Sequence, residues 1–110
     1  MILQRVEQAD WLSNSYLVID RPGGSGVLVD SNGVIEPLLE RVDREGTDLT
    51  HIIVTHDHWD HVVGIGELAK ERGVPVAAHP ITAEKVDFPV DIMLGDGDKL
   101  NSGDLEIEAI

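Results

Sequence analysis

The segment from Leu49 to Thr55 constrains the fold most strongly, because its centre, Ile52-Ile53-Val54, is apolar at successive positions. A strand with one face in water would alternate apolar and polar side chains. This segment therefore predicts a strand that is buried on both faces. Strands of that kind belong to parallel sheets whose two faces are covered by other elements, so the segment indicates an α/β fold.

Strand-like and helix-like segments alternate along the rest of the chain. Short apolar runs between Gly, Pro and Asp residues predict strands at 2–6, 16–19, 27–29 and 74–78, and a terminal hairpin formed by 99–100 and 105–110. The spacing of apolar residues predicts helices over 37–46 and 65–72 and a helical turn over 81–85, with 86–98 as loop. Strands interleaved with helices predict a layered α/β sheet within a single domain of 110 residues.

Composition narrows the function classes open to this chain. Its 21 acidic and 8 basic residues give a formal net charge of -13, which disfavours binding to the phosphates of nucleic acids. It has no cysteine, so a metal site would use imidazole, carboxylate or water. No apolar run reaches about 18 residues, the length of a membrane span, and the N-terminus has no signal-like apolar stretch. We therefore expect a cytoplasmic protein without nucleic-acid or membrane partners.

A cluster of histidines directly follows the central strand. The string His56-Asp57-His58-Trp59-Asp60-His61 contains three of the five histidines in the chain. Residues two apart in an extended segment point the same way, so the imidazoles of His56 and His58 can converge on one metal ion. Asp60 and His61 come where the chain turns into the next helix, and they can face a second point nearby. A chance patch of polar loop residues is the alternative, but α/β folds place their ligand sites at strand ends of this kind.

The residues around this cluster resemble a known family. The string Thr55 to His61 resembles the HxHxDH signature of the metallo-β-lactamase superfamily, although Val63-Gly64 stands where that family often has two glycines. Segments 14–18, 27–30 and 35–46 resemble the elements that precede the signature. The resemblance implies the first half of an αββα sandwich, a mixed sheet with helices packed on one face, with residues 1–110 as the N-terminal half of the domain.

The resemblance also implies roles for individual residues. His56 and His58 would bind a first metal ion, and Asp60 and His61 would bind a second. Asp60 would in addition orient the attacking hydroxide, and Asp30 would support the metal loop by hydrogen bonds. The donor set suits zinc, with iron or manganese as alternatives, and the resemblance implies two ions in the complete site. The implied activity is hydrolysis of a small-molecule thioester, as in glyoxalase II, or of a lactone, β-lactam or phosphoester.

The family's site needs further ligands that this chain does not match. They are a third histidine, a bridging aspartate and a distal histidine, and neither His51 nor His79 occupies those positions. We predict structural roles for His51 and His79, and we expect the site to require a C-terminal half or a partner chain. Two other hypotheses stay open. One is an iron-dependent redox enzyme of the same fold, similar to a persulfide dioxygenase, and the other is a partner-dependent metal-binding module without catalysis.

Overall fold

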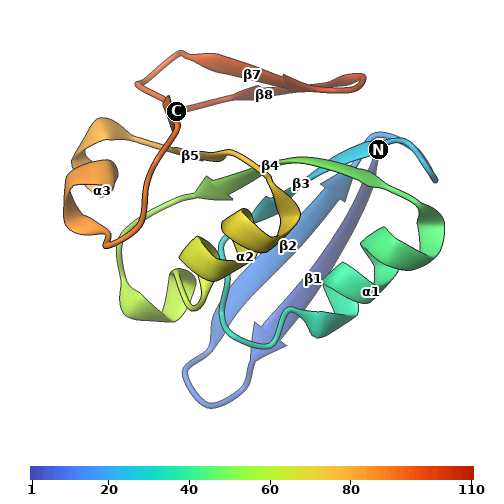
Figure 1. Ribbon diagram of the computed structural model, residues 1–110, viewed down its shortest axis with the longest axis horizontal. Coiled ribbons are helices and arrows are strands. Elements are labelled where there is room, and N and C mark those ends of the chain that lie inside the picture. The colour runs from blue at the N-terminus through green and yellow to red at the C-terminus, as the bar shows by residue number, and fades with distance from the viewer.

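A six-stranded mixed sheet forms the centre of the computed structural model, which describes residues 1–110 (Figure 1). The strands lie in chain order across the sheet. They are β1 (Ile2–Gln8), β2 (Ser13–Ile19), β3 (Ser25–Val29), β4 (Asp48–Val54), β5 (Val76–Ala78) and β6 (Ile92–Met93). The pairs β1–β2 and β2–β3 are antiparallel, whereas β3, β4, β5 and β6 pair in parallel. The parallel strands consequently end at the same edge of the sheet.

Helices connect the parallel strands, and a separate hairpin follows them. The helices are α1 (Glu36–Glu45), the 3-10 helix η1 (Trp59–His61), α2 (Ile65–Arg72) and α3 (Pro80–Lys85). The hairpin consists of β7 (Lys99–Ser102) and β8 (Leu105–Glu108). None of the helices combines the length and the apolar character that crossing a bilayer requires.

Most of the predicted elements are confirmed, and one prediction is wrong. Residues 86–98 were expected to be loop, but Ile92 and Met93 form β6 and pair with Ala77 and Ala78 of β5. A strand of two residues is too short to show an alternation of apolar and polar side chains. It forms by pairing with the neighbouring strand, so its own sequence does not predict it. β2 also begins at Ser13, three residues earlier than expected, because its pairing with β1 extends to Gln8.

The two faces of the sheet are covered by different elements. Helices α1 and α2 pack on one face over a core of buried apolar residues that includes Leu28, Leu38, Ile52 and Ile65. The β7–β8 hairpin packs on the opposite face, where Ala77, Leu94 and Leu100 are buried together with the partly buried Ile53, Ile92 and Ile107. The neighbours Ile52 and Ile53 therefore face opposite layers, as the apolar centre of β4 predicts.

Asp20 joins the turn after β2 to the turn between β7 and β8. Its Oδ1 accepts hydrogen bonds from the backbone N–H groups of Arg21 (2.7 Å) and Ser25 (2.8 Å), and its Oδ2 accepts one from Asp104 (3.0 Å). Arg21 also forms an ion pair with Asp104. Gly103 has a φ of 57°, and a Cβ atom there would lie 2.3 Å from Asp20 Oδ2, so this approach requires glycine. The hairpin is thus held to the sheet by polar contacts as well as by apolar packing.

The core position of Ile52 predicts a large loss of stability on truncation. Ile52 is 0% exposed, and Ile52→Ala should lower the free energy of unfolding by about 2–5 kcal/mol, because it leaves a cavity between β4 and the helices. Ile81→Ala is the matched control, since Ile81 is 59% exposed and its truncation should change stability by no more than about 0.5 kcal/mol. Urea unfolding followed by circular dichroism measures both variants. Equal losses would contradict the assignment of Ile52 to the core.

The hydrogen bonds to Asp20 predict a specific dependence of stability on pH. The backbone N–H groups of Asp104, Ser25 and Arg21 hold the pKa of Asp20 below the ordinary aspartate value of 3.8, although desolvation acts in the opposite direction. A carboxyl group with a lowered folded pKa stabilises the fold fully above its unfolded pKa and loses that contribution as the pH falls through its folded pKa. Asp20→Asn should therefore destabilise the protein at neutral pH, and its difference from wild type should shrink below pH 3.8.

Urea unfolding of both proteins between about pH 6 and about pH 3 tests this expectation. A destabilisation of constant size across that range would contradict it, because the charge of the carboxylate would then have no part in the effect.

Candidate metal centre

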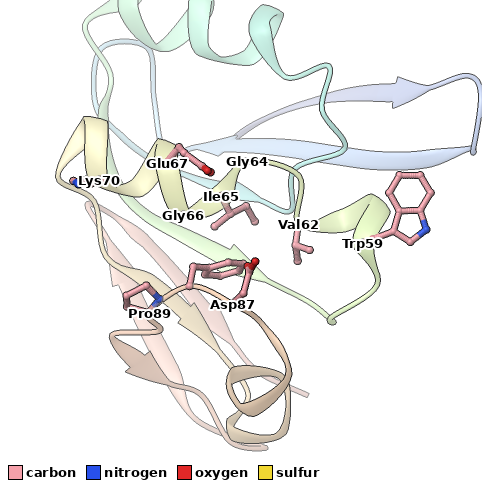
Figure 2. A pocket seen from close by; sticks show the side chains of 10 residues that line it. Trp59, Val62, Gly64, Ile65, Gly66, Glu67, Lys70, Asp87 and Pro89 are labelled. Atoms are coloured by element: carbon pink, nitrogen blue, oxygen red, sulfur yellow. The ribbon is translucent and has the colours of Figure 1, made fainter.

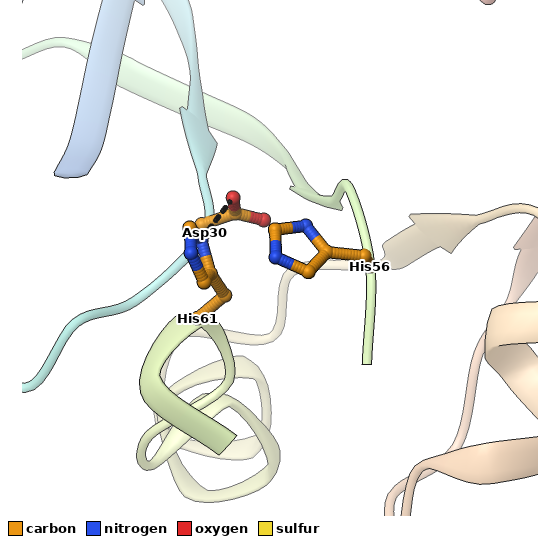
Figure 3. Close-up of side chains that lie close together, drawn as sticks. All are labelled: Asp30, His56 and His61. Carbon is orange, nitrogen blue, oxygen red and sulfur yellow. Dashed lines mark hydrogen bonds and ion pairs between the residues drawn. The ribbon is translucent and has the colours of Figure 1, made fainter. Parts of the chain in front are cut away.

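Three segments that carry polar side chains meet at one edge of the sheet. β3 and β4 are parallel, so their carboxyl ends lie side by side, and η1 follows β4 closely in the chain. Asp30 stands directly after β3, His56 lies two residues after β4, and His61 is the last residue of η1. Figure 3 shows the carboxylate of Asp30 and the rings of His56 and His61 close together. The parallel pairing therefore gathers residues that lie far apart in the sequence.

The buried carboxylate of Asp30 connects these segments. Asp30 is 3% exposed and has a left-handed backbone with a φ of 62°, a conformation that aspartate tolerates better than most residues do. Its Oδ1 accepts a hydrogen bond from the backbone N–H of Thr55 (2.8 Å). Its Oδ2 accepts one from the Thr55 hydroxyl (2.6 Å) and lies 3.0 Å from Nδ1 of His61. These contacts join Asp30 to the residue after β4 and to η1, while its support of a bound metal stays a prediction.

The imidazole rings of the HxHxDH motif lie close together. The ring centroid of His56 is 4.0 Å from that of His61 and 4.7 Å from that of His58. The rings of His56 and His58 are therefore neighbours, as their spacing in the sequence predicts. His58 is exposed to solvent, whereas His56 and His61 are half-buried.

The tightest donor group differs from the predicted set of ligands. One potential ligand atom from each of Asp30, His56 and His61 lies within 4.8 Å of the other two. The oxygens of Asp30 already face three hydrogen-bonding partners, however, and the residue is almost fully buried. Asp30 is consequently better suited to orienting His61 than to binding an ion directly.

Asp60 places a second carboxylate beside the imidazoles. Its Oδ2 lies 3.8 Å from Nε2 of His61, the ring nitrogen that faces away from Asp30. Three imidazoles and one carboxylate, without any thiolate, form a donor set that fits a divalent first-row metal ion. The assignment of His56, His58, Asp60 and His61 as ligands stays a prediction.

Two serines that the sequence pattern does not single out form hydrogen bonds to the motif loop, which is the segment after β4 that carries the HxHxDH motif. The hydroxyl of Ser13, in β2, donates a hydrogen bond to the backbone carbonyl of Asp60 (3.0 Å). Ser31 donates from its backbone N–H to the carbonyl of His61 (2.8 Å) and from its hydroxyl to the carbonyl of Val63 (2.6 Å). In the sequence, only the position of Ser31 directly after Asp30 indicates a role at the site. A serine there is equally typical of an ordinary turn.

The tryptophan inside the motif packs against the first hairpin of the sheet. Trp59 is 64% exposed, and its ring meets that of Trp11 edge-on, with the centroids 4.8 Å apart. A cavity of about 520 Å³ lies between η1, the start of α2 and the segment 87–89 (Figure 2). Trp59 lies at one end of this cavity and Pro89 lies toward the other.

The remaining two histidines have structural contacts, as predicted. His79 precedes α3 and caps it, because its Nδ1 accepts a hydrogen bond from the backbone N–H of Ile81 (3.1 Å). His51 lies within β4 with its Nδ1 2.8 Å from the hydroxyl of Thr50, and burial lowers its pKa. Neither belongs to the group of ring and carboxylate donors at the sheet edge.

Solved structures of known proteins share this fold. The chain superposes on ETHE1 from Myxococcus xanthus with a TM-score of 0.81, at 23% identity, over 98% of this chain and 47% of that one. It superposes on the B3 metallo-beta-lactamase BLEG-1 with a TM-score of 0.80, at 18% identity, over 97% of this chain and 59% of that one. At these identities the likeness concerns the fold, which is the mixed sheet with helices on one face that the sequence predicts.

Curated relatives match at the level of sequence. A hydroxyacylglutathione hydrolase from Rhodopseudomonas palustris (strain ATCC BAA-98 / CGA009) is 42% identical over 91 residues, which are 82% of this chain and 34% of that protein. A human hydroxyacylglutathione hydrolase-like protein is 38% identical over 96 residues, covering 86% of this chain and 31% of that protein. The chain thus spans about a third of the length of these relatives.

The family assignment rests on most of the chain. The profile of the metallo-beta-lactamase superfamily matches residues 9–93, a stretch that begins directly after β1 and ends with β6. It includes the strand that ends at Asp30 and the whole HxHxDH motif, from His56 to His61. With its fold, its motif and its relatives in agreement, the chain belongs to the metallo-beta-lactamase superfamily.

Proposed function

We propose that residues 1–110 supply the N-terminal part of a metal-dependent hydrolase site, in which His56 and His58 bind one metal ion and Asp60 and His61 bind a second. The observation that carries this proposal is the gathering of three imidazole rings, with centroids 4.0 and 4.7 Å apart, where β3 and β4 end. Imidazole rings gathered at a strand end, one of them oriented by a buried carboxylate, are typical of metal sites in α/β proteins.

Zinc is the proposed metal, with two ions in the complete site. Imidazole and carboxylate donors without sulfur suit zinc, and iron or manganese would accept the same donors. Bound divalent ions supply Lewis acidity, which polarises a carbonyl group and makes water a nucleophile at neutral pH.

The side chains of this chain have separate tasks in the proposed site. Asp60 is the proposed catalytic residue, because its carboxylate lies beside His61 and can accept a hydrogen bond from an attacking water. Asp30 orients the ring of His61 from the buried side. The exposure of His58 leaves the opposite side open to a small-molecule substrate.

The proposed substrate is a glutathione thioester. The sequence relatives are named hydroxyacylglutathione hydrolase, and they match up to 42% of the aligned residues. The likeness to ETHE1 and to a B3 metallo-beta-lactamase concerns the fold at 23% and 18% identity, so it does not favour iron redox chemistry or β-lactam hydrolysis over thioester hydrolysis. Lactones and β-lactams are the alternative substrates.

The complete site is proposed to include residues outside 1–110. Two metal ions shared among His56, His58, Asp60 and His61 would each have too few protein ligands for a closed tetrahedral site. The relatives are about three times as long as the matched segment, which supports further ligands from a C-terminal half or a partner chain. A metal-binding module without catalysis is the competing proposal, and the assays below separate the two.

Zinc binding should depend on the motif histidines. His56→Ala and His58→Ala should each weaken zinc binding by more than about 100-fold, beyond the 10- to 100-fold cost of losing a residue that only supports a ligand. Competition with a chromophoric chelator measures the affinity. His79→Ala is the matched control, because His79 caps α3 and lies outside the motif. The zinc affinity of this variant should equal that of the wild-type protein. An unchanged affinity in His58→Ala would contradict the role assigned to that residue.

Hydrolysis should require both metal and Asp60. In the full-length natural protein we expect a hydroxyacylglutathione thioester to be hydrolysed faster than a lactone, a β-lactam or a phosphodiester, and a chelator to abolish the activity until zinc is restored. Asp60→Asn should lower kcat by about 10² or more, as expected for loss of a group that orients the nucleophile. Thioester hydrolysis that persists in chelator would contradict a metal-dependent mechanism, and zinc binding without turnover of any substrate would favour the non-catalytic module.

A further inference from the structure

The hydroxyl group of Thr55 lies between the two ring systems of the metal centre. Thr55 is the first residue after β4, and its Oγ1 lies 2.6 Å from Oδ2 of Asp30 and 2.8 Å from Nδ1 of His56. The same Oδ2 atom of Asp30 lies 3.0 Å from Nδ1 of His61. A continuous chain of hydrogen bonds therefore runs from the His56 ring through Thr55 and Asp30 to the His61 ring.

The direction of each hydrogen bond in this chain is fixed by the available protons. An ionised carboxylate can only accept hydrogen bonds, so Asp30 Oδ2 accepts one from the Thr55 hydroxyl and one from Nδ1–H of His61. A threonine hydroxyl carries one hydrogen, which is used toward Asp30, so Thr55 Oγ1 must accept from Nδ1–H of His56. Both neutral rings then carry their proton on Nδ1, and both Nε2 atoms keep a free lone pair.

We propose that Thr55 is a positioning residue that sets the imidazole tautomer of His56, while Asp30 sets that of His61. This inference rests on the proposed function, in which both rings bind metal through Nε2, since a ring that binds through that atom needs a free lone pair there. Without the hydroxyl, Nδ1 of His56 loses its hydrogen-bond acceptor, and the proton can move to Nε2, where it blocks metal binding. Asp30 alone would continue to orient His61.

A second threonine of the same segment provides the matched comparison. The hydroxyl of Thr50, in β4, bonds to Ser102 Oγ at 2.6 Å and to the carbonyl of Gly26 at 3.3 Å. Thr50→Val and Thr55→Val each remove one threonine hydroxyl without a large change in side-chain shape. Only the second variant removes a hydroxyl that contacts Asp30 and His56.

The test combines nitrogen-15 NMR of the metal-free protein with zinc affinity. At about pH 8, above the usual histidine pKa of about 6.5, the wild-type spectrum should show His56 and His61 protonated on Nδ1. Thr55→Val should shift His56 toward the Nε2-protonated form and weaken zinc binding by about 10- to 100-fold, while leaving His61 on Nδ1. Thr55→Ser, which restores a hydroxyl, should return both the His56 tautomer and the zinc affinity to wild-type values. Thr50→Val should change neither.

Several outcomes would overturn the proposal. A wild-type His56 protonated on Nε2 does so directly, and this measurement needs no variant and no metal. A Thr55→Val protein with wild-type tautomer and wild-type zinc affinity does so as well. If the wild-type protein binds no zinc, the proposed function fails, and the spectrum of the metal-free protein still decides the role of Thr55. Should Thr55→Val not fold, the wild-type spectrum still decides, because a His56 protonated on Nε2 overturns the proposal.

Discussion

The carboxylate of Asp30 makes the contacts on which the geometry of the candidate metal centre depends. It lies at the end of β3, it accepts two hydrogen bonds from Thr55 just beyond β4, and it meets His61 in η1. A buried carboxylate without such partners would carry a large desolvation cost, so the geometry of the loop and the burial of Asp30 support each other. Removing the carboxylate would remove hydrogen bonds to two other segments of the chain, whereas removing a single imidazole would remove one donor.

The site uses both the parallel and the antiparallel parts of the sheet. The parallel strands β3 and β4 bring Asp30 and the histidine motif to one edge, and the antiparallel strand β2 contributes Ser13, which bonds to the carbonyl of Asp60. Ser31 binds the same loop from the residue after Asp30. Support from three directions gives a loop with few regular backbone hydrogen bonds a defined shape, and that shape is what a metal site requires.

The central part of the fold could be predicted from sequence because the pattern of its side chains indicates which of them are buried. Ile52 and Ile53 have successive apolar side chains, which only a strand covered on both faces can bury, and the structure covers them with helices and with a hairpin. The short strand β6 could not be predicted, because two residues become a strand only by pairing with β5.

The same distinction applies to the candidate site. The spacing of His56 and His58 predicts that their rings lie together, since residues two apart in an extended segment point the same way. The contacts of Ser13, Ser31 and Thr55 depend on which strand lies beside which, so a serine or threonine in these positions looks like any other small polar residue. Tertiary pairing, rather than local pattern, decides which hydroxyl groups serve the site.

The pairing of Trp11 with Trp59 has a spectroscopic consequence. These two residues are the only tryptophans in the chain. Trp11 lies in the turn between β1 and β2 and Trp59 in η1, so neither belongs to the apolar core between sheet and helices. Intrinsic tryptophan emission therefore reports on the docking of this loop against the first hairpin, while far-ultraviolet circular dichroism reports on the sheet and helices. If the loop detaches from the first hairpin before the sheet unfolds, tryptophan emission and circular dichroism will change in two separate transitions. The unfolding of the loop can then be followed separately from that of the sheet.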